Sequence, residues 1–275
     1  MAARSGGRLL LRIDDLDIER CTRQFEQHVI ADLDWLGVAF SEAPSRQSDS
    51  STAHARAIAT LASRDLVYPC RCSRADIARN AGSRRDPDGS PPHLGRCAAP
   101  AKSVLPAALR LDMARALTQV ARPLFWRELG EGVAGTLEAA DSAVWGDIVL
   151  ERKDGSASYH LAVVVDDDAQ NVSDVARGND LFHATALHRL LQELLGLAPP
   201  RYRHHRLVRD GAGVKLSKSA GSMALANARE SGVLPAQIRT ALGFGGAPRS
   251  DDQLVLAAIA GPDGAGVELG AWAIN

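Results

Sequence analysis

The sequence predicts an α/β fold in which a doubly wound parallel sheet is combined with a small zinc-binding insertion and a helical C-terminal region. Three observations lead to this prediction. A continuous apolar run at residues 8–13 is typical of a buried parallel strand, and the acidic cluster after it lies where such sheets bind ligands. Segments with helical and strand patterning alternate along the chain. Two pairs of metal-ligand residue types interrupt that alternation between residues 70 and 97.

The composition is that of an ordinary globular protein. The 275 residues are enough for one large domain or two. Hydrophobic residues make up 45% of the chain and charged residues 24%, and no apolar run is long enough to cross a bilayer. Because the N-terminus has no secretory pattern, we expect a cytoplasmic protein with no membrane partner. The net charge of −1 means that a nucleic-acid site would be a local basic surface.

The N-terminal strand is expected at residues 8–13 (RLLLRI), and Asp14, Asp15 and Asp17 follow it. These acids have two interpretations. They are ligand-binding groups at the carboxyl end of the strand, or they are the N-cap and first-turn acids of the next helix.

Two helices are expected next. The first ends at Gly37. Its apolar residues recur at helical spacing and are Phe25, Val29, Leu33 and Leu36. The second covers residues 51–63, with Ala55, Ile58 and Ala62 facing inward. Cys21 is interpreted as an ordinary helical residue.

The other cysteines belong to a candidate metal site. Four cysteines in a chain of this size do not predict a disulfide framework. Cys70 and Cys72 form a close pair, and His93 and Cys97 form a second one. Three thiolates and an imidazole satisfy tetrahedral zinc (Zn2+), although the 20 residues between the pairs fit no short zinc-finger template. From the spacing alone, zinc and unligated thiols remain open alternatives.

Strand patterning returns from residue 105. We expect strands at residues 107–111, 147–151 and 158–165, with an Asp-Gly turn at Asp154 and Gly155 joining the last two as a hairpin. Residues 158–165 are apolar on both faces, which is typical of a buried strand. Three consecutive acids, residues 166–168, would then lie at the carboxyl edge of that strand.

The C-terminal third is expected to contain a helix, a strand and two further helices. The first helix carries Ala184, Leu187, Leu191 and Leu194 on one face. Residues 202–209 read as a short basic strand, a pattern typical of a solvated face. Helices follow at residues 223–230 and 235–242.

A loop at residues 213–219 (GVKLSKS) carries Lys215 and Lys218 among glycines and serines. Glycines free the backbone, and two ammonium groups beside hydroxyls suit a mobile phosphate clamp. A solvated turn is the alternative interpretation.

Together these segments resemble the class I glutamyl-tRNA synthetase family. The likeness runs from residue 8 to about residue 244. It rests on several motifs in one order, namely LLRIDDLD (10–17), RQS (46–48), LVYPCRCSR (66–74), YHLAVVVDD (159–167), VARGNDL (175–181) and KLSKS (215–219). The chain is most similar to the short paralogues, the glutamyl-queuosine tRNA(Asp) synthetases, because it stops soon after KLSKS and carries a C-x-C pair.

The resemblance implies a Rossmann-type catalytic core and ATP-dependent activation of glutamate. The glutamate would then be transferred to queuosine in the anticodon loop of tRNA(Asp). The implied partners are glutamate, ATP with Mg2+, and tRNA(Asp) carrying queuosine, and a monomer is expected. Lys215 and Lys218 would stabilise the pyrophosphate as charge develops on it, with Lys218 also binding ATP.

Further site residues follow from the matched motifs. Asp14 matches a glutamate that holds the substrate ammonium, and it is one methylene shorter. Tyr159 and Arg177 match the pair expected at the substrate side-chain carboxylate, which arginine can bind by two parallel hydrogen bonds. His93 stands where the paralogues have tyrosine. With the resemblance added, zinc is expected at Cys70, Cys72, His93 and Cys97.

One departure concerns the start of the fold. The family's first strand and helix, with the HIGH-type motif that binds ATP from the other side, precede the segment matched by residues 10–17 and are not found in this sequence. We therefore expect a core without that strand and helix and an impaired ATP site. Two alternatives remain: the catalytic part of a glutamyl-tRNA synthetase, and a catalytically inactive, zinc-stabilised tRNA-binding homologue.

The expected organisation has four parts. Residues 1–65 form the first part of the catalytic core, residues 66–105 the zinc-binding insertion, residues 106–208 the second part of the core, and residues 209–275 the KLSKS loop and helical C-terminal region.

Overall fold

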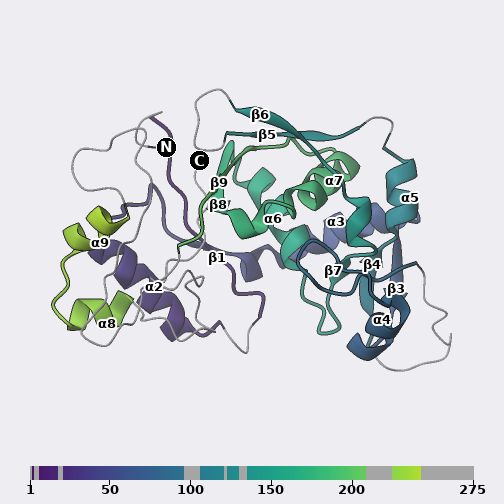
Figure 1. The fold of residues 1–275 in the computed structure, drawn as a ribbon, viewed down its shortest axis with the longest axis horizontal. Helices are drawn as coiled ribbons and strands as arrows, with labels where there is room; N and C mark the ends of the chain where they lie inside the picture. Colours follow the sequence, from purple (N-terminus) through teal and green to yellow (C-terminus); the bar gives the residue numbers. More distant parts are fainter. Residues whose placement is uncertain are drawn as a thin grey trace.

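A computed structural model describes residue 2 and residues 6–17, 21–95, 106–120, 123–129, 135–208 and 225–242. Figure 1 shows most of the strands and helices gathered in one part of the molecule, while helices from near the two ends of the described chain lie together beside it. No helix in these ranges has the length and apolar content that a bilayer span requires.

The described strands form three sheets. The first pairs β1 (Arg12–Ile13) with β2 (Ser45–Arg46) in parallel. The second has the order β3–β4–β7, with β3 (Val67–Cys70), β4 (Ala108–Leu111) and β7 (Val149–Glu151). The third has the order β6–β5–β9–β8, with β5 (Phe125–Glu128), β6 (Thr136–Ala139), β8 (Asp174–Gly178) and β9 (Arg201–His205).

The α/β class is confirmed, but the sheets are mixed rather than parallel throughout. Strands β5, β9 and β8 are parallel to one another, whereas β3–β4, β4–β7 and β5–β6 are antiparallel. The connections explain the difference. A short segment joins β5 to β6, which suits antiparallel pairing, whereas a helix crossover carries the chain from β8 back to a parallel β9. The expected strand at residues 8–13 is reduced to β1.

Residues 158–165 were expected as a strand, and this prediction is wrong. They lie in helix α6 (Tyr159–Ala169), whose N-terminus is capped by Ser158 accepting a hydrogen bond from the Leu161 backbone N–H. Gly155 does form a turn, and an isolated bridge joins Glu151 to Ala157, but no second strand follows. A helix that is buried on most sides and a buried strand both have a continuous apolar sequence. The periodicity of apolar residues could therefore not distinguish the two.

Helix α6 packs between α3 (Ser51–Ser63) and α7 (Thr185–Leu195) in the main core. Leu61, Leu161 and Leu187 are fully buried there, one from each helix. Two short helices, α4 (Arg74–Ala81) and α5 (Met113–Thr118), also belong to this part. So do the 3-10 turns η1 (Gln47–Ser50), η2 (Ala143–Trp145) and η3 (Asn179–Leu181).

The bounds predicted for α3 are confirmed, but its inward face is not the predicted one. Ala55 and Ala62 are exposed, and only Ile58 of the predicted set faces inward. The buried residues are His54, Ala57, Ile58 and Leu61. His54 belongs to the inward face, where its imidazole hydrogen-bonds the buried Asp166 of α6 at 2.9 Å.

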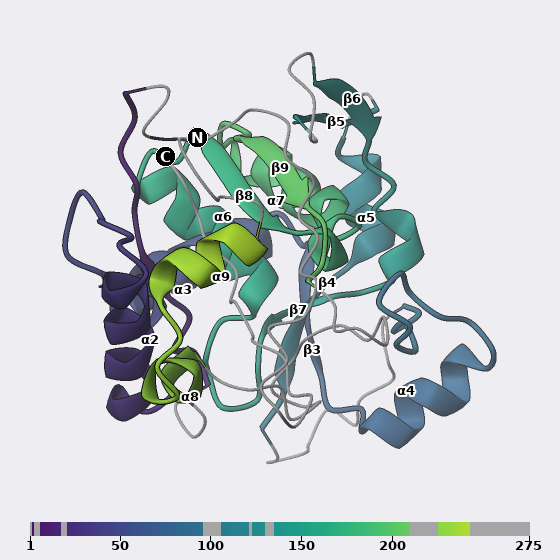
Figure 2. The same ribbon diagram turned by 60° about the vertical axis from the view of Figure 1, so that its left-hand side comes forward.

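The N-terminal helix is α2 (Arg23–Trp35), as the apolar spacing predicted. Thr22 caps it, so the acids at residues 14–17 are not its cap, and Cys21 precedes the helix rather than lying in it. Gly37 follows with a φ of +75°, a conformation that favours glycine. Both views place α2 beside α8 (Leu225–Glu230) and α9 (Pro235–Ala241), which were also predicted (Figure 2).

A buried polar network ties β1 to helix α6. Arg12 donates from Nη2 to the Asp167 carboxylate at 2.7 Å and from Nη1 to Gln170 at 2.8 Å. Asp166 accepts from Gln47 at 3.1 Å and pairs with His54. Burial raises the pKa of Asp167, and the Arg12 charge opposes that rise. The network therefore fixes the strand that precedes Asp14 against the helix that begins at Tyr159.

Replacing Asp167 with alanine is expected to lower the free energy of unfolding by about 1.5–3 kcal/mol, because the Arg12 guanidinium loses its 2.7 Å carboxylate partner. The nearest remaining carboxylate is that of Asp166, 3.9 Å from Arg12 Nε. Urea denaturation measures this change. The neighbouring Asp168 is exposed, so Asp168→Ala is the matched control and should change stability by less than about 0.5 kcal/mol. Equal changes in the free energy of unfolding for the two substitutions would show that the buried Arg12–Asp167 pair does not stabilise the fold.

Candidate functional site

Three of the residues singled out in the sequence lie around one point. Asp14 directly follows β1, Tyr159 is the first residue of α6, and Arg177 lies in β8. Burial raises the pKa of the Tyr159 hydroxyl, the charge and a hydrogen bond of Arg177 lower it, and the charges of Asp167 and Asp14 raise it. Because Asp14 and Arg177 both act on Tyr159, the fold brings all three together.

Arg177 is 4% exposed, and besides Tyr159 its guanidinium contacts four further neighbours. Nε donates to His204 Nε2 and Nη1 to His188 Nδ1, each at 3.0 Å. Nη2 donates to Thr185 Oγ1 at 2.6 Å and to the Leu181 carbonyl at 3.2 Å. These partners are all neutral groups. A buried cation surrounded by neutral acceptors is well suited to an anionic ligand, since burying an unpaired charge is costly.

The histidines around Arg177 are neutral for physical reasons. Burial, followed by the charge of Arg177, lowers the pKa of His160 to about 4 and that of His188 well below its usual range. Burial also lowers the pKa of His204, although the hydrogen bond that its Nδ1–H donates to Glu128 raises it. Among Arg177 and these three histidines, the positive charge therefore lies on the arginine guanidinium.

Asp14 lies at the surface side of the site. It is exposed, yet the protein packed around its carboxyl raises the pKa of that group. A hydrogen bond from the Leu16 backbone and the charges of Arg152 and Arg12 oppose the rise. Cys21 donates its thiol hydrogen to the Asp14 carbonyl at 3.2 Å. An exposed carboxylate and a buried guanidinium that both act on the same tyrosine suit a ligand with a cationic and an anionic end.

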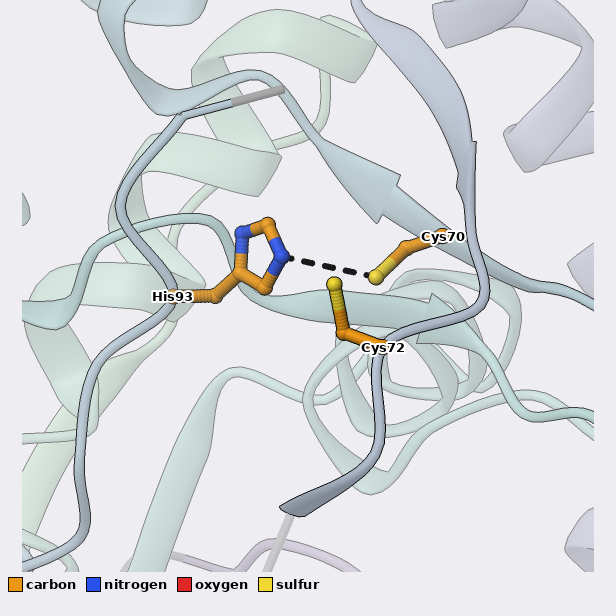
Figure 3. A group of neighbouring side chains, drawn as sticks. All are labelled: Cys70, Cys72 and His93. Carbon is orange, nitrogen blue, oxygen red and sulfur yellow. Dashed lines mark hydrogen bonds between the residues drawn. The ribbon is translucent and has the colours of Figure 1, made fainter. Parts of the chain in front are cut away.

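A second constellation brings together three of the four residues expected to bind metal. The ligand atoms of Cys70, Cys72 and His93 all lie within 4.8 Å of one another. Figure 3 shows the His93 ring pointing toward both sulfur atoms, with His93 Nε2 at 3.4 Å from Cys70 Sγ. Cys70 ends β3, and the chain between Cys72 and His93 contains α4. This donor set, two sulfurs and one imidazole nitrogen, is one that zinc prefers.

The far side of the His93 ring is also held. Its Nδ1 lies 3.1 Å from the Tyr68 hydroxyl, and that hydroxyl donates to Asp147. Such an outer contact fixes the ring so that Nε2 faces the sulfur atoms. Gly146 passes so close that a Cβ there would lie 2.4 Å from the His93 carbonyl oxygen. A glycine is therefore required beside this histidine.

Three predicted site residues, Cys97, Lys215 and Lys218, lie outside the described residues. The sequence also missed several residues that the structure places at the sites. His188, His204 and Thr185 contact Arg177, and Glu128 contacts His204. Tyr68 and Asp147 support His93. The available signal in the sequence was that Tyr202 and His204 occupy alternate positions, as residues on one face of a strand do. A solvated basic face was expected there, but both side chains are buried.

The chain matches one family model, described as tRNA synthetases class I (E and Q), catalytic domain, over residues 1–260. It is 41% identical over 257 residues to a glutamyl-Q tRNA(Asp) synthetase of Rhodobacter capsulatus, covering 89% of this chain and 91% of that relative. It is 37% identical to the protein of the same name from Geobacter sulfurreducens, covering 84% of this chain and 71% of the relative.

Longer relatives match as well. A glutamate–tRNA ligase of Syntrophus aciditrophicus is 33% identical over 245 residues, and the chain spans 49% of its length. Among solved structures, a glutamate tRNA ligase from Elizabethkingia meningosepticum superposes with a TM-score of 0.67 at 22% identity, covering 92% of this chain and 58% of that one. This structural likeness supports the fold alone.

Proposed function

The chain belongs to the class I tRNA synthetases for glutamate and glutamine, and from this premise we propose that it activates glutamate with ATP and transfers it to queuosine in tRNA(Asp). The observation that carries the proposal is the buried Arg177 guanidinium, held by neutral partners beside Tyr159 and Asp14. The similarity to glutamyl-Q tRNA(Asp) synthetases over most of both chains supports the choice of acceptor.

Recognition of glutamate would use the two ends of the site. The side-chain carboxylate binds Arg177, where a charge-assisted hydrogen bond is stronger than one to a neutral acceptor. The substrate carboxylate would accept an Arg177 N–H that is donated to a neutral partner, such as the Tyr159 hydroxyl, in the absence of substrate. The exposed Asp14 carboxylate binds the ammonium group. Glutamine carries no negative charge, so it leaves Arg177 unpaired and is rejected.

The reaction needs positioning and charge neutralisation more than covalent help from the protein. An oxygen of the glutamate α-carboxylate attacks the α-phosphorus of ATP, and pyrophosphate leaves. Lys215 and Lys218 are our proposed pyrophosphate clamp, with Mg2+ entering on the ATP. A hydroxyl of the queuosine cyclopentene-diol then attacks the activated carbonyl carbon, which gives an ester and releases AMP. We place this reaction in a cytoplasmic monomer.

Zinc is proposed at Cys70, Cys72, His93 and Cys97. The fit rests on the donor set, on the convergence of the three described ligand atoms, and on the Tyr68 contact that aims His93 Nε2 at the sulfur atoms. When bound, such an ion cross-links the chain and contributes folding free energy rather than chemistry. The division of the chain at residues 66–105 follows from this assignment and stays a prediction.

Glutamate-dependent exchange of pyrophosphate into ATP tests the activation step. The assay is run on this chain and on any longer in-frame product of its gene, without tRNA, and glutamine serves as the control substrate. We expect pyrophosphate exchange with glutamate and none with glutamine. No exchange in either protein, combined with binding of tRNA(Asp), would favour a catalytically inactive homologue.

A second candidate is the catalytic part of a glutamate–tRNA ligase. The 33% identity to the ligase of Syntrophus aciditrophicus is the observation in its favour. The two candidates predict different acceptors, the anticodon loop of tRNA(Asp) and the 3′ end of tRNA(Glu), so the acceptor decides between them.

A further inference from the structure

We propose that Glu128, His204 and His188 are positioning residues that hold the Arg177 guanidinium in one orientation by fixing the tautomers of the two histidines. The inference rests on the proposed function in one respect, namely that Arg177 binds the substrate carboxylate. None of these three residues is expected to touch the substrate. They would act through Arg177 from two other elements, β5 and β9, and from helix α7.

The direction of each hydrogen bond follows from the chemistry of arginine. A guanidinium carries five N–H donors and no acceptor. His204 Nε2 and His188 Nδ1, each 3.0 Å from an arginine nitrogen, must therefore both be unprotonated acceptors. Each neutral imidazole then carries its single proton on the other nitrogen, which is Nδ1 in His204 and Nε2 in His188.

Glu128 supplies the group that holds the His204 proton on Nδ1. Its Oε2 lies 2.6 Å from His204 Nδ1, and its Oε1 accepts from the His204 backbone N–H at 3.0 Å. The Trp126 indole N–H also points at Oε2, at 3.4 Å. Both oxygens of the Glu128 carboxylate therefore accept hydrogen bonds from N–H groups. A side chain with an N–H donor at either of these positions would face another donor.

The other histidine is fixed in a similar way. His188 Nε2 lies 3.2 Å from His160 Nδ1, which must accept the proton that His188 carries. The groups facing His188 are Arg177 from β8, Tyr159 and His160 from α6, and His204 from β9. Its neutral state agrees with the lowered pKa that burial and the Arg177 charge impose. Thr185 Oγ1 closes the network, since it accepts from Arg177 and lies 3.3 Å from His204 Nε2.

This arrangement makes an isosteric change informative. In Glu128→Gln the amide keeps the shape of the side chain, but its NH2 must face either the His204 backbone N–H or His204 Nδ1. In the second orientation, the proton of His204 moves to Nε2 and opposes the Arg177 Nε–H. A residue that merely fills space would tolerate this change, whereas a positioning residue would not.

The test measures KM for glutamate and for ATP in pyrophosphate exchange, together with imidazole 15N shifts by NMR. Glu128→Gln and His188→Leu should each raise the glutamate KM about 10- to 100-fold, as expected for a lost hydrogen bond to a charged group, while the ATP KM stays unchanged. His188→Asn places an amide oxygen near the position of Nδ1 and should restore the glutamate KM to within about threefold of wild type. Glu193→Gln, which alters the surface partner of Arg189, is the matched control.

NMR keeps the inference testable without activity. In the wild-type protein, His204 should carry its proton on Nδ1 and His188 on Nε2, and Glu128→Gln should move the His204 proton to Nε2. A wild-type His204 protonated on Nε2, or a glutamate KM in Glu128→Gln equal to that in Glu193→Gln, would overturn the inference. Absence of glutamate-dependent exchange in the wild type would instead count against the proposed function, with the tautomers still decided by NMR.

Discussion

Replacing Arg177 with glutamine should lower kcat/KM for glutamate by roughly 100- to 1,000-fold, because the substrate carboxylate then enters a buried site with no compensating charge. The loss should lie mainly in the glutamate KM. Activation of glutamine, which carries no charge at that end, should fall much less. The ratio of kcat/KM for glutamate to kcat/KM for glutamine therefore shows whether Arg177 binds the substrate carboxylate.

Two further variants separate this role from folding. Arg177→Lys keeps the charge but loses the planar fork, so it should still lose at least about tenfold in kcat/KM while remaining folded. Arg201→Gln is the matched control, since Arg201 lies on the neighbouring strand and its exposed side chain pairs with the buried Asp174. A folded Arg177→Lys protein with an unchanged glutamate KM would remove Arg177 from the substrate site.

Loss of the proposed zinc ion should lower the stability of the fold strongly. Apparent zinc-binding free energies in small structural sites are on the order of 10 kcal/mol. If even about 3 kcal/mol of this is lost, Tm should fall by about 10 °C in a domain of this size. We expect Cys70→Ser to abolish zinc binding and to produce this drop, with metal content measured by atomic emission and Tm by calorimetry.

The control for this prediction is Cys21→Ser, since Cys21 lies outside the cluster and its hydroxyl replacement can still donate to the Asp14 carbonyl. This variant should keep its zinc and its Tm. Dialysis of the wild-type protein against a chelator should reproduce the Cys70→Ser result. A purified protein without zinc, whose Tm is unaffected by Cys70→Ser, would mean that the three ligands are unligated thiols and a structural histidine.

Much of the fold could be predicted because its helices are amphipathic. The bounds of α3 and the region of α2 follow from apolar residues at helical spacing, with Gly37 marking the end of α2. Helix α6 could not be recognised in this way, because Leu161, Ala162, Val163 and Val164 bury four consecutive positions. A continuous apolar run carries no period, so only tertiary packing decides between helix and strand.

The candidate sites were predictable where the signal is local. The close spacing of Cys70 and Cys72 indicated a ligand pair, and the fold brings His93 to it. The surroundings of Arg177 were not predictable, since Glu128 and His204 are 76 residues apart in sequence and meet only because β5 and β9 are neighbours. Burial also turned a basic segment, typical of a solvated face, into one that contributes Tyr202 and His204 to the interior.

The transfer step tests the central claim most directly. Radiolabelled glutamate and ATP are supplied with tRNA(Asp) that carries queuosine, with the same tRNA lacking queuosine, and with tRNA(Glu). Nuclease fragments then locate the label. The proposed function predicts label in the anticodon fragment of queuosine-containing tRNA(Asp) and none in the other two tRNAs. Label at the 3′ end of tRNA(Glu), with none in the anticodon fragment of tRNA(Asp), would contradict it.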